Sequence, residues 1–491
     1  MLKKFFNVSM VLVFTFYAPV LKAAQHLELT IDKAIEMALD RSPRIRGASL
    51  DLDEAEAKRK QSRAQFGPKL QFEMRALYFN EAPSIGGDMP SMDSGGVNIA
   101  DELKSLDDII QVIGDDADKA LSQGLMGVGQ GLQGIIDTFS NFDTMFASEK
   151  YDVTITTRLV QPLTPLWAIY QMYKLSEIEV DIASLAIERQ RMDLAFEVRQ
   201  VCLRLLQAEA GIEAMDEAIS AIEAHLKTAR HFLDEGLISK NDLLQIQVRL
   251  ADIKGKRLKT QNGLDMAKAT IAMLLDIPPS TDIRIVAPDM DPDIEKVPDL
   301  SSAQQQASKN RPEMKELNLR IAQAECGIRA SWQGFIPSVS AMAQYQHNEG
   351  SIMVPPAWTL GVVVDFNVWE WGATYYANEQ ARVKLERAKQ GRQQLQRGIQ
   401  LQVRSAWLKI HQSSEQVKIA KEALSQAEEQ LRLEKERYEV QQNTSTDVLD
   451  AQTRLTQAKV TEEAARIELL EALAALDNAM GRGPSRTREQ P

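Results

Sequence analysis

The chain has 491 residues, and its 69 Asp and Glu outnumber its 57 Lys and Arg, so its formal net charge is −12. This acidic balance argues against a nucleic-acid-binding protein, which needs a basic face to meet phosphates. Two cysteines, Cys202 and Cys326, are too few for a disulfide framework or a four-cysteine zinc site.

The first residues predict export. Lys3 and Lys4 precede an apolar stretch, and small residues follow at Ala23 and Ala24. This pattern is typical of a secretory signal peptide at 1–23, with an uncleaved anchor helix as the alternative. Beyond it, no stretch approaches the roughly 18 apolar residues of a spanning helix, so we expect any membrane crossing to use strands.

The rest of the chain is an internal duplication. Pro43 matches Pro312 at an offset of 269, and Asp242 matches Asp447 at an offset of 205. The domains expected from these offsets are a first repeat at 24–277, a linker rich in Pro and Asp at 278–298, a second repeat at 299–481 and a tail at 482–491.

Each repeat is predicted to run helix, strand, strand, long helix, returning helix. The first repeat is expected to have these elements at Arg44–Gly67, 69–79, 151–160, Gln171–Glu235 and Ile238–Leu275. The second is expected to have them at Glu313–Ile336, 338–346, 358–368, Thr374–Arg437 and Thr446–Met480. Residues 80–150 have no counterpart in the second repeat, and we expect them to form an outward-facing loop between the first two strands; a dispensable disordered loop is the alternative.

The long helices carry one apolar seam. From Leu194 to Leu233, apolar positions recur at alternating steps of four and three, and the same stripe returns from Ile399 to Tyr438. A sustained period of 3.5 predicts coiled-coil hairpins, whereas an ordinary bundle shows a drifting 3.6 period. Each returning helix and the short helix of its repeat together nearly match the long helix in length, which predicts end-to-end stacking along it.

The four strands alternate apolar and polar residues over about ten positions, the length that crosses a membrane as a tilted strand. Val362 and Val364 are expected to face lipid, and aromatic residues at the run ends suit interfacial belts; a half-buried soluble sheet is the alternative. Because four strands cannot close a barrel, we expect the chain to oligomerise. The charged side chains expected to line the barrel lumen are Glu73, Arg75, Asp152 and Arg158.

Several motifs together resemble the TolC family of outer-membrane efflux proteins over essentially the whole mature chain except 80–150. They are the helix starts at Ser42-Pro43 and Arg311-Pro312, the Phe-Gly-Pro and Phe-Ile-Pro runs before the strands, VVVDFNVWEWG after the last strand, and the turns FLDEGLISKNDLL and RYEVQQNTSTDVLDAQ. The resemblance implies a mostly α fold with a transmembrane β-barrel portion: a homotrimer with a 12-stranded barrel in outer-membrane lipid and a periplasmic α-helical tunnel. It also implies an exit duct of a tripartite efflux pump or a type I secretion system, which docks to a periplasmic adaptor (membrane-fusion) protein and an inner-membrane pump of the RND or ABC type.

The resemblance further places Asp447 and Asp450 at the periplasmic tip, where the family narrows its tunnel with acidic rings. Tyr438 is retained beside this expected gate, while Asn443 stands where some relatives have an Arg that ties the closed state. Mutual repulsion of carboxylates in a narrow mouth is expected to raise some of their pKa values; simple helix capping is the alternative for each Asp. The tip residues expected to contact an adaptor are Gly236, Leu237, Ser239, Asp242, Gln441, Asn443, Thr444 and Ser445.

The sequence holds no motif for catalysis: HExxH, a phosphate-cradling Gly-Lys-Ser/Thr loop and Gly-x-Ser-x-Gly are all missing. We therefore expect no enzyme, no cofactor and no metal site. A periplasmic coiled-coil adaptor or scaffold remains the rival hypothesis, because it shares the signal peptide and the heptads. A passive porin is disfavoured, since most of the chain is predicted to be helical.

Overall fold

The structure is a computed structural model, and it describes residues 27–80, 151–290, 292, 294–350, 356–440 and 442–483. The chain forms two compact units. The helical unit contains Met1–Arg59, Lys174–Gly327 and Gln380–Pro491, and the sheet unit contains Lys60–Tyr173 and Ile328–Glu379. Each unit takes segments from both repeats, so the compact units cut across the duplication seen in the sequence. The expected signal peptide and the insert from residue 81 onwards lie outside the described residues.

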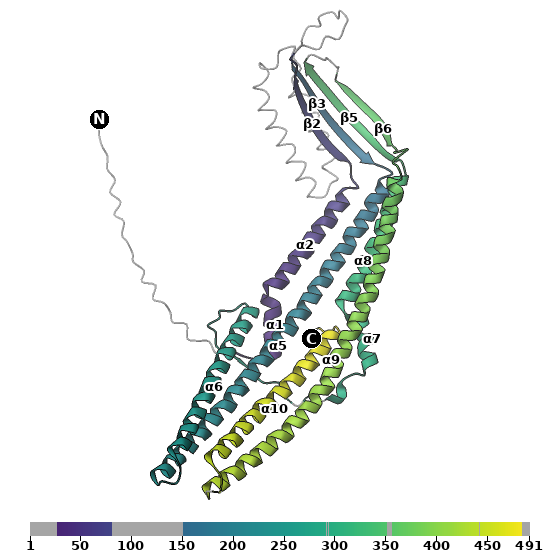
Figure 1. Cartoon of the computed structure of the whole chain (residues 1–491). Helices are drawn as coiled ribbons and strands as arrows, with labels where there is room; N and C mark the ends of the chain where they lie inside the picture. Colours follow the sequence, from purple (N-terminus) through teal and green to yellow (C-terminus); the bar gives the residue numbers. More distant parts are fainter. Residues whose placement is uncertain are drawn as a thin grey trace, which may run out of the picture. The chain divides into compact units, whose positions relative to one another are not determined.

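The sheet unit is built on four antiparallel strands in the order β2-β3-β5-β6 (Figure 1). They are β2 (Lys69–Tyr78), β3 (Tyr151–Pro162), β5 (Ser338–Gly350) and β6 (Ala357–Asp365). The alternation therefore identified all four strands, but not all of their ends. β6 stops at Asp365 rather than at Val368, and β5 continues past Gln346 to Gly350.

The register separates the two faces of this sheet as the sequence pattern predicted. Arg158 lies opposite Gln71 and Gln344, on the face shared by Glu73, Arg75 and Asp152. Val362 and Val364 lie opposite Ala341 and Val339 on the other face. Residues on facing strands alternate sides together, so one polar and one apolar face follow directly from the pairing.

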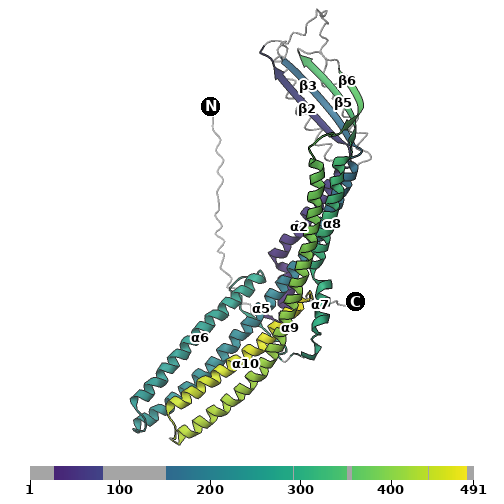
Figure 2. The ribbon, with the colours of Figure 1, turned by 45° about the vertical axis from the view of Figure 1, so that its right-hand side comes forward.

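Two long helical hairpins dominate the helical unit and lie side by side (Figures 1 and 2). The first consists of α5 (Leu166–Asp234) and α6 (Lys240–Leu274), and the second of α9 (Ala373–Glu439) and α10 (Ser445–Ala479). The predicted seam is confirmed along α9, where Ile399, Val403, Ile410 and Tyr438 are all buried. No helix within the described ranges has the length and hydropathy that spanning a bilayer requires.

Each hairpin has a short companion helix that begins with proline: α2 (Pro43–Ala64) and α8 (Pro312–Ser331). The predicted helix to Ile336 is wrong at its end, because the chain tightens into a 3₁₀ turn, η2, at Trp332–Phe335. Ile45 of α2 shares a core cluster with Leu274 and Leu194, so the start of α2 meets the end of α6 beside α5. This contact agrees with the end-to-end stacking predicted from the helix lengths.

The sequence analysis missed a small layer within the helical unit. Strand β1 (Leu27–Leu29) pairs in parallel with β4 (Ile283–Ile285), inside the predicted linker, which also holds the 3₁₀ turn η1 (Ile294–Lys296). Two equivalent helices accompany them, α1 (Ile31–Arg41) and α7 (Leu300–Asn310). Asp299 caps α7 by accepting hydrogen bonds from Ser301 and Ser302, and these bonds hold the pKa of its carboxyl at about 2.

Candidate functional site

The turns that connect the long hairpins carry most of the predicted site residues. In the first turn, Gly236 takes a positive φ of 76°, and the backbone N–H of Leu237 donates to the carbonyl of Phe232 at 2.8 Å. This geometry ends α5 with a left-handed residue, which glycine adopts at little cost. Ser239 then starts α6 in a capping box with Asp242, whose carboxylate accepts from the Ser239 N–H at 3.0 Å.

The second turn starts α10 with the same device. Asp447 accepts from the backbone N–H of Thr444 at 2.9 Å and from its hydroxyl at 2.7 Å. These two bonds lower the pKa of the Asp447 carboxyl, with the hydroxyl contributing most. Within one protomer, then, the shift of Asp447 is opposite to the increase expected from carboxylate repulsion, and its first role is that of a helix cap.

Asp450 differs from Asp447 because it takes no part in the cap. Its side chain is 60% exposed, and one carboxylate oxygen lies 3.9 Å from the guanidinium of Arg249 on α6. Arg249 also donates from Nε to the hydroxyl of Thr453 at 3.1 Å. Arg249 of the first hairpin thus lies beside Asp450 of the second. Because this ion pair is exposed, it contributes no more than about 1 kcal/mol to the stability of the contact.

Tyr438 lies in a buried cluster that joins the two hairpins. Its side chain is only 6% exposed, and its ring centroid lies 4.8 Å from that of His225 and 5.7 Å from that of Phe232, both on α5. The Nε2 atom of His225 is 2.7 Å from the hydroxyl of Ser445 at the start of α10. Sequence reasoning missed His225, because no pattern shows that it meets a residue 220 positions away.

Burial shifts the titration of both rings in this cluster. Burial, together with the nearby positive charge of Lys435, lowers the pKa of His225 to about 4. Burial also raises the pKa of Tyr438. His225 is therefore neutral at pH 7, which suits a ring held between aromatic side chains and a hydroxyl.

Asn443 binds its own hairpin rather than the neighbouring one. Its amide donates to the backbone carbonyl of Glu434 at 3.0 Å and to the Glu434 carboxylate at 2.6 Å. Further direct contacts between the hairpins come from Thr446, which donates to Gln245 at 2.9 Å, and from an ion pair of Lys459 with Glu217. Leu449 adds an apolar contact to the core cluster of the first hairpin.

The structure separates the predicted adaptor contacts by exposure. Gly236, Leu237, Ser239 and Thr444 are exposed, whereas Asp242 and Asn443 are half-buried. Ser445 is 5% exposed and its hydroxyl lies 2.7 Å from Nε2 of His225, so its side chain is not accessible in this structure; its contact with an adaptor stays a prediction. Gln441 lies outside the described residues.

The predicted lumen residues share one face but are not all available to solvent. Glu73 and Arg75 form an exposed ion pair at 2.9 Å, and Arg158 donates from Nε to Gln344 at 3.1 Å. Asp152 is buried, and the Thr154 hydroxyl lies 3.4 Å from its carboxylate. Across the part of the chain that the structure describes, no group of three or more His, Cys, Asp or Glu could hold a metal ion.

Comparison with known proteins identifies this architecture. Residues 303–482 match the family model of the outer membrane efflux protein. No curated protein sequence matches the chain. Three crystal structures with the same fold are a membrane protein from Pseudomonas aeruginosa (15% identity, TM-score 0.71, covering 94% of this chain and 93% of that one), the outer membrane protein VceC of Vibrio cholerae (14%, 0.69, 93% and 97%) and the CmeC outer membrane channel of Campylobacter jejuni (14%, 0.70, 94% and 87%).

The fold is therefore that of solved outer-membrane channels. Residues 303–482 thus resemble the outer membrane efflux protein family in sequence, and the fold resembles that of outer-membrane channels over more than nine-tenths of the chain. This confirms the resemblance found in the sequence.

Proposed function

We propose that three copies of this chain form the exit duct of a tripartite efflux pump or a type I secretion system. The observation that carries the proposal is the four-stranded sheet with one charged and one apolar face, built from both repeats of a chain whose helices form two long hairpins. Three copies would supply 12 strands, with Glu73, Arg75, Asp152 and Arg158 toward the lumen. Closing the sheet in this way removes the free edges that lipid does not tolerate.

At the other end of the hairpins, we propose that Asp450 forms the acidic ring of the periplasmic gate. Its exposed carboxylate is free of the helix cap, whereas the Asp447 carboxylate accepts both hydrogen bonds that complete the cap. Tyr438 acts behind this ring, because its burial against His225 holds the second hairpin to the first. The three Asp450 carboxylates of a trimer would attract cations to the mouth, where a narrow passage focuses the field.

The exposed turn residues are proposed to receive a periplasmic adaptor, which connects the duct to an inner-membrane pump. Gly236, Leu237, Ser239 and Thr444 are the accessible members of this set. Leu237 is the apolar one, with a side chain 48% exposed at the turn itself. Replacing Leu237 by Asp should therefore reduce cross-linking to the adaptor without reducing the amount of trimer.

The barrel part of the proposal is tested by two substitutions on opposite sheet faces. Val362→Arg places a charge on the apolar face of β6 and should cost about 2–4 kcal/mol in the bilayer, so less trimer reaches the outer membrane. Arg158→Ala, on the charged face, should leave the amount of trimer unchanged. Outer-membrane fractionation and heat-dependent migration of the trimer provide the readout. Equal effects of the two substitutions would contradict the assignment of the faces.

A further inference from the structure

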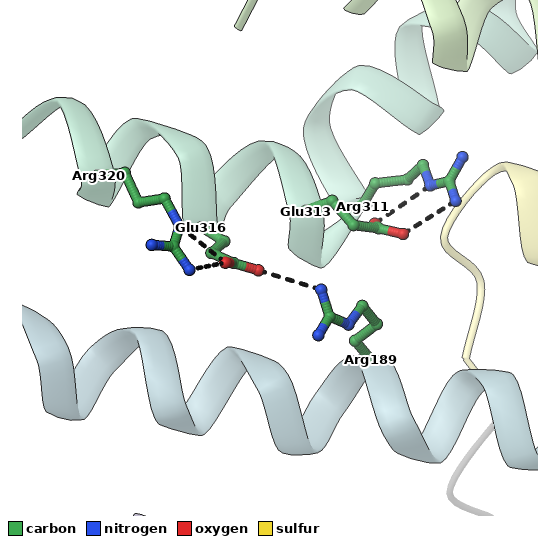
Figure 3. Close-up of polar contacts among 5 residues, drawn as sticks. All are labelled: Arg189, Arg311, Glu313, Glu316 and Arg320. Atoms are coloured by element: carbon green, nitrogen blue, oxygen red, sulfur yellow. Dashed lines mark hydrogen bonds and ion pairs between the residues drawn. The ribbon is translucent and has the colours of Figure 1, made fainter. Parts of the chain in front are cut away.

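Within one protomer, α5 of the first repeat contacts α8 of the second repeat. Arg189 of α5 lies 3.3 Å from Glu316 of α8, and Arg320 approaches the same carboxylate at 2.7 Å (Figure 3). Further along the same two helices, Gln323 of α8 donates a hydrogen bond to Glu179 of α5. These polar contacts fix the position of α8 of the second repeat along the axis of α5 of the first repeat.

Contacts link four helices in a row within the helical unit. Arg44 of α2 pairs with Glu197 of α5 at 2.6 Å, α5 contacts α8 as described, and Met314 of α8 shares a core cluster with Ile399 of α9. The row thus runs α2, α5, α8, α9, with α2 and α9 at its two ends. In a duplicated chain, the counterpart of the α5–α8 contact is a contact between α9 and α2. Within one copy, α2 and α9 lie at opposite ends of the row and do not meet among the described residues.

The duplication states which residues that contact would join. The offset of 205 relates Glu179 of α5 to Lys384 of α9, and the offset of 269 relates Gln323 of α8 to Glu54 of α2. The hydrogen-bonded pair inside the protomer thus corresponds to a pair of opposite charges. By the same offset, Arg320 corresponds to Asp51, which lies one helical turn from Glu54.

The charges of the two end helices are complementary over a longer stretch. Between residues 379 and 404, α9 carries only two acids, Glu379 and Glu386. Among the described residues, none of its basic side chains there has an ion-pair partner. These basic residues, all exposed, are Arg382, Lys384, Arg387, Lys389, Arg392, Arg397 and Arg404.

On α2, Asp51 and Asp53 are exposed, and Glu54 makes only an exposed ion pair with Lys58. Such an exposed pair contributes little and can be exchanged for another partner. Each end helix also exposes a large apolar side chain beside its charges: Leu50 on α2 is 66% exposed and Val383 on α9 is 61% exposed. Apolar contact flanked by opposite charges is the composition of a protein interface with a defined partner.

We propose that the side of α9 that carries Lys384 and Arg387 in one copy docks on the side of α2 that carries Glu54 and Asp51 in the next copy, with Lys384 opposite Glu54 and Arg387 close to Asp51. The proposal rests on the proposed homotrimer and adds which surfaces and which charges select the neighbour. The two faces differ, so the interface is head-to-tail, and a head-to-tail interface closes into a ring when its rotation fits. The contact between α9 of one copy and α2 of the next then corresponds to the contact between α5 and α8 within one copy, and it is stabilised by apolar burial and ion pairs.

A disulfide cross-link tests the pairing directly. Glu54→Cys combined with Lys384→Cys should give covalent dimers and trimers of the full-length chain on non-reducing gels after mild oxidation of outer membranes. The control pair, Glu54→Cys with Lys389→Cys, turns the second cysteine about 140° around α9 and should give monomers. The parent protein controls for Cys202 and Cys326, which are both buried.

A charge exchange provides an independent measurement. Glu54→Lys alone and Lys384→Glu alone should each lose most of the heat-sensitive trimer, because like charges then face each other. The double variant should recover it, and Lys389→Glu should not change it. A trimer that forms normally without the 54–384 cross-link, and that is unaffected by either reversal, would overturn the proposed docking but leave the exit duct intact. A parent protein that never trimerises would overturn both.

Discussion

The turn between α5 and α6 and the turn between α9 and α10 begin their second helices with the same capping box, Ser239 with Asp242 and Thr444 with Asp447. They differ in what lies next to the cap. The residue that follows the cap residue is exposed Lys240 in the first turn and buried Ser445 in the second. In the first hairpin, the residue after the cap therefore faces solvent. In the second hairpin, the residue at the same position contacts the first hairpin.

This difference bears on the proposed gate, because the two turns share one aspartate but not the other. Asp242 and Asp447 occupy equivalent positions and make equivalent hydrogen bonds, so their presence in both turns is explained by helix initiation. Asp450 corresponds to Gln245 in the first repeat, and only the second turn has a charge there. The feature that separates the two turns chemically is therefore Asp450 together with the Tyr438 cluster behind it.

The largest difference between the turns should appear when an aromatic ring is removed. Tyr438→Ala removes a buried side chain at the contact between the hairpins and should destabilise that end of the hairpins by about 3 kcal/mol. Leu237→Ala, on the exposed first turn, should cost less than about 0.5 kcal/mol. Amide hydrogen exchange of the two turns measures both effects; equal protection in the two variants would contradict the asymmetry.

Acid should loosen the second turn more than the first. His225 is neutral and buried with a pKa of about 4, compared with 6.5 for the free side chain, so the contact is fully present above pH 6.5. As the pH falls from 6.5 toward 4, the separated hairpins bind a proton that the joined hairpins exclude. At pH 5.5 the joined state should lose about 1 kcal/mol relative to pH 7.5.

The pH effect can be assigned with two substitutions on one helix. His225→Gln keeps a hydrogen-bonding side chain near Ser445 but cannot titrate, so exchange of the second turn should become independent of pH over this range. His231→Gln, at an exposed position of α5, should leave the pH dependence as it is in the parent. A pH dependence that survives His225→Gln would show that another group controls the contact.

The two caps should respond alike. Asp242→Ala and Asp447→Ala each remove the carboxylate that completes a capping box, and each should destabilise the first turn of its helix by about 1 kcal/mol. Hydrogen exchange at the starts of α6 and α10 measures the two losses. A loss at Asp447 well above that at Asp242 would mean that Asp447 has a further structural role.

The fold was predictable wherever one chemical pattern decides the local structure. Alternation over ten residues defined the strands, and the 3.5-residue seam defined the long helices, because each pattern reports a single buried face. The layer of β1 and β4 was missed for a physical reason. Each strand has three residues, Leu27–Leu29 and Ile283–Ile285, and gains its stability from pairing with the other across the length of the first repeat.

The site was predictable only in part. The aspartates and Tyr438 stand in recognisable turn motifs, but the roles of the two aspartates differ by which backbone groups they reach, and that depends on the turn geometry. Ser445 looked like an exposed turn residue because its neighbours are polar. Its burial depends on His225, whose own surroundings in the sequence are those of an ordinary helix.

Asp450, rather than Asp447, is proposed to carry the charge of the periplasmic mouth. This proposal is tested most directly by the conductance of the purified trimer in a planar bilayer, with a multivalent cation added on the side of the helical tunnel. Asp450→Asn should weaken the cation block by about tenfold, equivalent to about 1.4 kcal/mol of binding free energy, whereas Asp447→Asn should weaken it less. Block that is unchanged in an intact Asp450→Asn trimer would contradict the account.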